Sequence, residues 1–415
     1  MHKTVKKLPP LLLAAVLLAL FAACPALAAE KKARDVVKDC KFKASVHQEN
    51  TFQMKNDVLN RLWNGGVKGT LNVTLPGKDK AQGVMLAFNT FVPRLVIESL
   101  DSEDHPVIAE YRDPFFNQYI DFSEPVHAFR IAPAEDNTQA VRISRMNVYT
   151  QGKLPSSVQR WRQMADGDAD LLLIVTHPDD DILWFGGLLP TYAGEKQMKV
   201  LVAYADTGYR WDRRNELLDA LWLCGVRDYP VMPPDRTAED FRSYAVDCIR
   251  RYKPQVVVTQ DVNGEYGHAD HLKLVSAVIR AVKKDCADPE ACPDSAAAYG
   301  VFRPQKLYVH LWKKNMSIFN WNVKLKAFGG KTGMALARQA FKKHVTQQNG
   351  RHEVLDRGVY DCRKLGLYWS RVGEDNTKKP DLFQNVIPRE EDAFASLREE
   401  APAAPEDGEA PAPRT

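Results

Sequence analysis

The sequence predicts an α/β domain built on a parallel sheet, preceded by a β-sandwich. Three observations support this fold class. Short strand-like runs with closely spaced turn residues fill the chain from 41 to 150, as in β-sandwiches. From residue 171 onward, continuous apolar runs alternate with helical segments, which is typical of a buried parallel sheet. Charged clusters follow two of these runs, where a parallel sheet collects its functional groups.

The first region contains six runs rich in aromatic and β-branched residues, with Pro, Gly, Asp and Asn between them. The expected strands are Val84–Phe88, Leu95–Ser99, Val107–Tyr111, Tyr119–Phe122, Ala128–Ile131 and Val141–Tyr149. As a whole the region resembles a galactose-binding-type jelly roll, and it contains no diagnostic motif. A structural docking role and a role in sugar binding both stay open.

The second region has four expected strands and two well-marked helices. The strands are Leu171–Val175, Val200–Ala205, Val256–Thr259 and Leu307–Leu311. One amphipathic helix is expected from Arg213 to Leu223, with Gly225 as its stop signal. Another begins near His271, and its apolar face consists of Leu274, Val275, Val278, Ile279 and Val282. Residues 313–372 show no clear periodicity and are expected to complete this domain.

Both ends of the chain differ in composition from the rest. Three lysines precede the uninterrupted apolar segment Leu11–Ala23, and Ala26-Leu27-Ala28 offers a small-residue cleavage site. This order predicts a secretory signal peptide rather than a membrane span. Ala22-Ala23-Cys24 leaves a lipid anchor at Cys24 as an alternative. The tail from Glu399, rich in Ala, Pro and Glu, is expected to be disordered.

These signals divide the chain into a signal peptide (1–29), a β-sandwich domain (30–150), a linker (151–164), an α/β domain (165–372) and a C-terminal extension (373–415). The protein is therefore expected to be secreted, periplasmic or attached to the cell envelope. Removing the three leader lysines lowers the formal net charge from +4 to +1. A net charge this close to zero does not indicate a nucleic-acid-binding protein.

Cysteine use agrees with export. Besides Cys24 the chain has six cysteines, and an even number in an oxidising compartment permits up to three disulfides. Cys286 and Cys292 flank a short loop and are the easiest pair to close, although fifteen full pairings exist. No Cys-x-x-Cys spacing suggests a thiolate zinc site, so a structural role is expected.

Two clusters of ionisable residues supply the candidate chemistry. They are Thr176-His177-Pro178-Asp179-Asp180-Asp181 and Gly264-Glu265-Tyr266-Gly267-His268-Ala269-Asp270-His271. One imidazole and three carboxylates at a single strand end require a cation to hold them together. Catalytic zinc commonly has three His or carboxylate ligands and a water, and His177, a neighbouring aspartate and a downstream histidine would meet that number. Alone, each cluster is equally well explained as a helix cap or an incidental His-x-x-His; together they favour a metal.

The same segments resemble a known family. Leu171–Gly187, with its His-Pro-Asp-Asp core, and Tyr266–His271 are similar to the two signatures of the PIG-L (LmbE-like) zinc-dependent de-N-acetylases. Between them, Arg213-Arg214-Asn215-Glu216 and Cys224-Gly225-Val226 resemble the family's Arg-x-x-Glu helix and its Leu-Gly-Val end. The resemblance covers roughly residues 165–370 and implies a Rossmann-like fold.

Position by position, the resemblance implies a zinc or other divalent metal ion held by His177, Asp180 and His271. Asp179 matches the base that takes a proton from a metal-activated water. His268 matches the histidine that assists the tetrahedral intermediate.

Tyr266 matches a residue that helps to hold the oxyanion of that intermediate. Arg213 matches an arginine that binds substrate, with a solvated helix arginine as the alternative. Asp270 either orients a histidine of the site or lies exposed on its helix.

The chain departs from the family at Asp181, where Glu is usual. The shorter side chain puts in doubt a contact to the groups around the metal ligands, not the ligand set. His344 and Gln347 either line the pocket or are structural. Trp184 and Phe185 are expected in the core.

The function expected from these features is removal of the acetyl group from an N-acetylated amino sugar, such as an N-acetylglucosamine-type glycan or glycoconjugate. An amidase that acts on a different amide is one alternative. A glycan-binding surface protein with an inactive α/β domain is the other, and the complete set of site residues argues against it. No membrane span and no nucleic-acid partner are expected.

Overall fold

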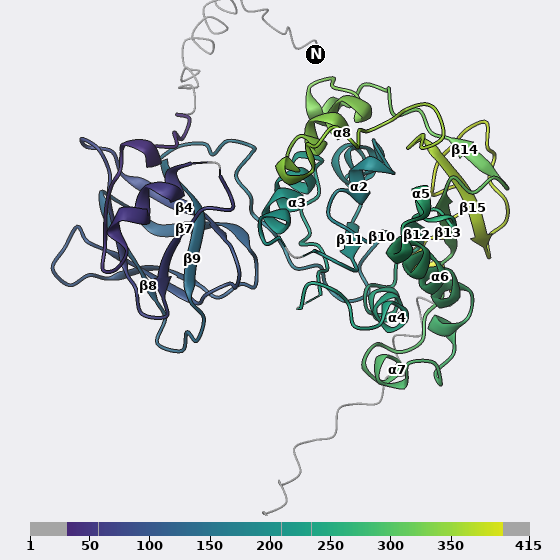
Figure 1. Cartoon of the computed structure of the whole chain (residues 1–415), viewed down its shortest axis with the longest axis horizontal. Coiled ribbons are helices and arrows are strands. Elements are labelled where there is room, and N and C mark those ends of the chain that lie inside the picture. The colour runs from purple at the N-terminus through teal and green to yellow at the C-terminus, as the bar shows by residue number, and fades with distance from the viewer. Residues whose placement is uncertain (1–30, 57, 209, 234, 393–415) are drawn as a thin grey trace, which may run out of the picture.

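The computed structural model describes residues 31–392 except 57, 209 and 234. The expected signal peptide, the anchor at Cys24 and the tail beyond residue 392 lie outside these residues. The chain forms a β-rich part and an α/β part, which lie side by side (Figure 1). Among the helices that can be described, none has both the length and the apolar character needed to cross a membrane.

The β-rich part consists of two antiparallel sheets packed around a common core. One sheet has the strand order β1-β3-β8-β5-β6 and the other the order β2-β9-β4-β7. The strands are β1 Lys41–Ala44, β2 Trp63–Gly66, β3 Leu71–Thr74, β4 Ala81–Phe88, β5 Leu95–Ser99, β6 Val107–Tyr111, β7 Asn117–Val126, β8 Ala128–Pro133 and β9 Val141–Thr150. Trp63, Phe88 and Phe129 are fully buried between the sheets. All six expected strands are present, and three short strands between 41 and 74 were not predicted.

The α/β part is built on a mixed sheet with the order β11-β10-β12-β13-β15-β14. Its strands are β10 Leu171–Val175, β11 Val200–Tyr204, β12 Val256–Thr259, β13 Lys306–His310, β14 Met316–Ile318 and β15 Lys364–Ser370. The first four strands in this order are parallel, as expected. The last two pair antiparallel, so the sheet is not wholly parallel.

Helices cover both faces of this sheet. The helices are α2 Asp180–Leu183, α3 Asp212–Leu223, α4 Phe241–Tyr252, α5 Gly264–Gly267, α6 Ala269–Lys283, α7 Pro293–Tyr299 and α8 Gly333–Phe341. Short 3-10 or π turns are η1 Val37–Asp39, η2 Gln48–Lys55, η3 Pro190–Glu195, η4 Asp285–Ala287, η5 Lys326–Phe328, η6 Val345–Gln347 and η7 Arg389–Glu391.

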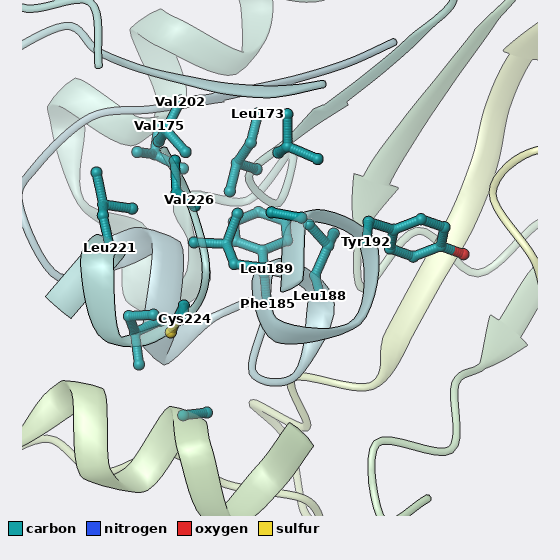
Figure 2. Packing of buried hydrophobic residues seen from close by; sticks show 14 of the residues in the cluster. Leu173, Val175, Phe185, Leu188, Leu189, Tyr192, Val202, Leu221, Cys224 and Val226 are labelled. Atoms are coloured by element: carbon teal, nitrogen blue, oxygen red, sulfur yellow. The ribbon is translucent and has the colours of Figure 1, made fainter. Parts of the chain in front are cut away.

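Alternate strand residues pack against different helices, because successive side chains of a strand point to opposite faces. Leu173 and Val202 pack with η3, α3 and α8, around Phe185 (Figure 2). Leu172 and Leu201 pack on the other face with α4 and α6. This two-sided burial explains why the strands are continuously apolar. Helix α3 ends as expected before Gly225, whose φ of +90° suits glycine.

The two parts of the chain share a buried polar interface along α3. The Asn215 side-chain amide donates to the Phe88 carbonyl (3.1 Å) and to the Ser144 hydroxyl (3.3 Å). The Phe116 N–H donates to the Tyr229 hydroxyl at 3.0 Å. The helix that carries Arg213 is therefore held by both parts.

The six described cysteines are all unpaired, and this includes Cys286 and Cys292, the pair that the sequence makes easiest to close. The loop between them is closed differently. The buried guanidinium of Arg250 donates to the backbone carbonyls of Cys286, Cys292, Asp285 and Asp288 at 2.7–3.3 Å. One arginine thus closes the loop that a disulfide between these two cysteines would close.

Residues 375–392, expected as an extension, pack along the amino ends of the sheet strands. Lys306 on β13 has a fully buried side chain that pairs with Asp375. Arg389 donates to the carbonyls of Gly167, Ala169 and Lys253. This segment therefore supplies the partner of the Lys306 ammonium, which would otherwise be buried without a counter-charge.

Asp375→Ala is predicted to destabilise the protein by about 3–5 kcal/mol, since it leaves the Lys306 ammonium buried without its partner. Burial already lowers the pKa of Lys306, against the effect of Asp375. Urea denaturation measures the loss. The control is Asp168→Ala, which breaks the exposed pair with Lys199 and should cost less than about 1 kcal/mol. Equal losses in the two variants would contradict this role of Asp375.

Candidate active site

The site lies where β10 and β12 end, at the carboxyl edge of the parallel strands. After β10 the chain turns sharply through Asp179, which has a φ of +109°, and enters α2 at Asp180. After β12 it turns through Glu265, with a φ of +54°, before α6 begins. Positive φ is costly for a residue with a side chain and is concentrated at functional sites. The two sharp turns bring the two sequence clusters together.

Three donor atoms from these clusters form a small triangle. The Nδ1 of His177 lies 3.2 Å from the Nε2 of His271 and 3.4 Å from the Oδ2 of Asp180. The third side, between His271 Nε2 and Asp180 Oδ2, is 3.3 Å. Ligand atoms at about 2.0–2.1 Å from a tetrahedral zinc ion lie about 3.3–3.4 Å from one another. The donor set and its spacing therefore fit a metal ion.

His268 lies beside this triangle. Its ring centroid is 4.8 Å from that of His177 and 4.6 Å from that of His271. The three histidines could also hold a metal ion, since one nitrogen of each lies within 4.8 Å of the others. The distances to Asp180 are shorter, so Asp180 is the better third ligand on geometry and His268 is the neighbour.

The charges at the triangle also call for a cation. Burial opposes ionisation of Asp180, but His271 and His177 lower its pKa well below the usual range. Burial likewise opposes a charge on His271, yet Asp180 and Glu265 raise its pKa to about 10. Two buried carboxylates thus require positive charge between them, from a proton or from a metal ion.

Residues behind the triangle fix the orientation of His271. Its Nδ1 lies 2.7 Å from Glu265 Oε2, and that carboxylate also contacts His310 Nδ1 at 3.2 Å. The Glu265 carboxylate can only accept, so this shorter contact favours a proton on Nδ1, which the Gln260 amide nitrogen also approaches at 2.9 Å, and it leaves the Nε2 lone pair directed at the triangle. Such a carboxylate behind a ligand histidine is a regular feature of metal sites.

Asp180 is fixed in the same way. Its Oδ1 accepts a hydrogen bond from the indole N–H of Trp184 at 2.8 Å. Its Oδ2 accepts a hydrogen bond from the backbone N–H of His177 at 2.7 Å. Trp184, expected only as a core residue, therefore also positions a candidate ligand. Phe185 is fully buried, as expected.

Asp179 lies beside the triangle, nearly buried. Burial and the adjacent Asp180 raise its pKa well above the usual range, while Arg213 opposes the shift. Arg213 Nη2 donates to Asp179 Oδ1 at 3.2 Å and to the Pro178 carbonyl at 2.5 Å. The arginine expected to bind substrate thus also holds the candidate base.

His268 is the N-cap of α6. Its Nδ1 accepts a hydrogen bond from the Asp270 N–H at 3.3 Å, which assigns the proton of the neutral ring to Nε2. Burial, His177 and His271 lower the pKa of His268. In its neutral form the ring can therefore donate a hydrogen bond through Nε2.

A hollow of about 190 Å³ opens over these groups. Tyr266, half-exposed, and Gln347 line it together with His352, which the sequence did not indicate. His344 is completely buried outside this lining, and neither ring nitrogen has a hydrogen-bond partner among residues 31–392 as described. Of the two uncertain pocket residues, only Gln347 lines the hollow.

Residues 172–282 match the family model described as GlcNAc-PI de-N-acetylase, PIG-L. The chain contains a PIG-L domain. This confirms the family resemblance found in the two sequence signatures.

Curated relatives match over the same region. The chain is 27% identical over 180 residues to 1D-myo-inositol 2-acetamido-2-deoxy-alpha-D-glucopyranoside deacetylase 1 of Frankia casuarinae, covering 33% of this chain and 57% of that enzyme. It is 28% identical over 184 residues to the deacetylase of that name from Thermobifida fusca, covering 34% and 64%. The chain thus spans little more than half the length of these relatives.

Solved structures show weaker likenesses. N,N'-diacetylchitobiose deacetylase from Pyrococcus horikoshii is 17% identical, with a TM-score of 0.33 over 44% of this chain and 72% of that chain. The family 32 carbohydrate-binding module of Clostridium perfringens NanJ, solved with galactose, is 15% identical, with a TM-score of 0.25 over 28% and 98%. At these scores the likenesses support no assignment.

Two acids of the PIG-L domain lie away from the hollow. Asp181 is fully buried near Tyr204, and no described group makes a hydrogen bond of good geometry to its oxygens. Burial raises the pKa of Asp181 to about 7, although the nearby Tyr204 hydroxyl acts to lower this pKa. Asp270 pairs with Lys273 at 3.1 Å and stays 4.0 Å from His268. Neither acid has a side-chain contact with the triangle, and each is only the sequence neighbour of one of its residues.

Glu265→Gln is predicted to weaken metal binding by about 10–100-fold, because the neutral amide no longer fixes the His271 tautomer or raises its basicity. Competition with a fluorescent zinc chelator measures the dissociation constant. Glu239→Gln removes an exposed carboxylate of the same domain and serves as the control. Equal zinc affinity of the two variants would contradict a positioning role for Glu265.

His344 should make stability depend on pH. Burial, assisted by the positive Arg213, lowers its pKa to about 3, against about 6.5 when unfolded. The unfolded chain therefore gains a proton first, and the contribution to stability, complete above pH 6.5, falls by about 1.4 kcal/mol per unit as the pH drops. In urea denaturation, the stability of the wild type relative to His344→Phe should decline from pH 6 to pH 4. A constant difference would contradict the burial of a neutral ring.

Proposed function

We propose that this protein is an exported, zinc-dependent hydrolase that removes the N-acetyl group from an N-acetylated amino sugar. The observation that carries the proposal is the donor triangle of His177, Asp180 and His271 with the nearly buried Asp179 beside it. The printed names of the relatives, deacetylases of an acetamido-glucopyranoside, favour an N-acetylglucosamine-type substrate. The leader-like N-terminus favours export to the periplasm, the cell envelope or the medium.

We also propose a role for each of the two domains. Residues 165–372 would form a Rossmann-like catalytic domain, and residues 30–150 a sandwich domain that supports it. The buried interface along α3 favours a supporting role, because it fixes the helix that presents Arg213 to the hollow.

The metal ion would be held by His177, Asp180 and His271. When bound, it would supply a Lewis acid that activates water and polarises the acetamide carbonyl. The chain's own residues perform the proton transfers.

Asp179 accepts a proton from the attacking water, and the water oxygen forms a bond to the acetyl carbon. The ion pair with Arg213 holds the carboxylate in place for this transfer. The Nε2–H of His268 and the hydroxyl of Tyr266 stabilise the negative charge that develops on the carbonyl oxygen. The proton on Asp179 then passes to the amide nitrogen, the C–N bond breaks, and acetate and a free amine leave.

A second candidate is an amidase that acts on a different amide. The same residues describe attack on a carbonyl and do not choose the acyl group. The names of the relatives, deacetylases of an acetamido-glucopyranoside, favour an acetyl group.

The proposal is tested by zinc content and by amine release from N-acetylglucosamine oligomers. Wild-type protein should hold one zinc ion per chain and release amine. Asp179→Asn should retain zinc but lose about 10²–10⁴-fold in kcat, because the general base is absent. Asp166→Asn, which alters an exposed partner of Arg251, is the matched control and should be fully active.

Two results would contradict the proposal. Protein that binds no metal ion at any stage would exclude the hydrolase mechanism. Protein that binds zinc but releases no amine from any N-acetylated sugar would favour the amidase.

A further inference from the structure

A second hollow lies between the sandwich and the α/β part. Its volume is about 660 Å³, more than three times that of the active-site hollow and within the range of about 300–1,000 Å³ that small-molecule sites have. Strand β9, helix α3 and the region from η5 to the end of α8 form its walls. Figure 1 shows α3 on the side of the α/β part that faces the sandwich. No residue assigned to the deacetylase reaction lines this hollow.

The floor is a buried, fixed polar group. Arg145 from β9 makes two parallel hydrogen bonds to Asp219 on α3, at 2.7 and 2.8 Å. Gln159 donates to the same carboxylate at 2.5 Å. Only about a tenth of each side chain of the ion pair is exposed. The pair neutralises Asp219, so the floor adds no net charge to the hollow.

Three further cations surround this floor. Arg227 donates to the carbonyls of Trp222 and Val226, and its guanidinium lies 3.9 Å above the Trp222 ring. Lys331 donates to the neutral amide of Gln339 at 3.2 Å. Lys343 also lines the hollow. Within the described part of the chain, no carboxylate forms an ion pair with any of the three.

This arrangement leaves the hollow positively charged. Burial and the positive charge of the nearby Arg162 lower the pKa of Arg227. Several positive charges that line one concave surface attract anions and raise their local concentration. The hollow is therefore suited to a ligand with at least one negative charge.

The remaining groups match a hydroxylated ring. Ser156 and Ser157 offer hydroxyls, and Asn147 and Gln339 offer amides that can donate and accept. Tyr149 and Phe328 add aromatic surface from the sandwich and from η5. Amphipathic aromatic groups together with amides and hydroxyls suit the mixed apolar and polar faces of a sugar.

We propose that this hollow binds an anionic sugar, a hexose-sized unit that carries a carboxylate or a phosphate group. The cations come from the α/β part, and the sandwich contributes Asn147 and Tyr149, so the ligand contacts both parts. This site is separate from the deacetylase site and does not depend on the function proposed for it. It gives the sandwich a binding role alongside its structural one.

Isothermal titration calorimetry on the full chain without its leader tests the proposal with four probes. They are glucuronic acid, glucose 6-phosphate, glucose and inorganic phosphate. One of the two anionic sugars should bind saturably, at least tenfold more tightly than glucose and than inorganic phosphate. The tighter of the two identifies the acidic group, and added salt should weaken its binding.

The double variant Lys331→Gln/Lys343→Gln should weaken this binding at least tenfold. Both side chains are exposed, so the melting temperature should not change. Lys342→Gln, an exposed neighbour that does not line the hollow, is the matched control and should bind like the wild type.

Three outcomes would overturn the proposal. The first is that neither anionic sugar shows saturable binding. The second is that inorganic phosphate binds as tightly as glucose 6-phosphate, which would make the hollow a simple anion site. The third is that the double variant binds the sugar as tightly as the wild type does. Zinc content and amine release are not used in this test, so its result is distinct from that of the deacetylase experiment.

Discussion

The contact between the Asp180 carboxylate and the two imidazoles of His177 and His271 is the constraint on which the rest of the site depends. These groups are largely withdrawn from water, and isolated buried charge is costly unless it is paired. The surrounding bonds serve this contact: Glu265 fixes one histidine and Trp184 fixes the carboxylate. A bound cation would compensate both buried acids at once.

Holding this contact requires strain in the backbone. Asp179 and Glu265 both have positive φ, at a typical cost of about 1–3 kcal/mol each. The fold tolerates this because the parallel strands beneath the turns are buried on both faces and the helices that follow are packed. The sandwich adds support from the side, through its bonds to α3. The candidate base and the candidate ligands are therefore held in place from several sides.

Much of this organisation could be predicted from the sequence, because apolar runs and strand-end clusters are local signals. The strands around the site and the convergence of the two clusters follow from them. Glu265 lies in one of the two clusters, but its role and that of His310 were not indicated, since they arise from a sharp turn and from contacts between distant strands. Strands such as Lys41–Ala44 are too short and polar to stand out. The sequence left the state of Cys286 and Cys292 open, because no local pattern shows that Arg250 closes the loop between them.

X-ray absorption spectroscopy of the zinc-loaded protein measures the central contact most directly. A site formed by two imidazoles and one carboxylate predicts nitrogen and oxygen neighbours at about 2.0–2.1 Å, with the outer-shell scattering of two histidine rings. Asp180→Ala should remove zinc or change this shell. A spectrum without histidine scattering, or one unaltered in Asp180→Ala, would contradict the assignment of these three residues as the metal ligands.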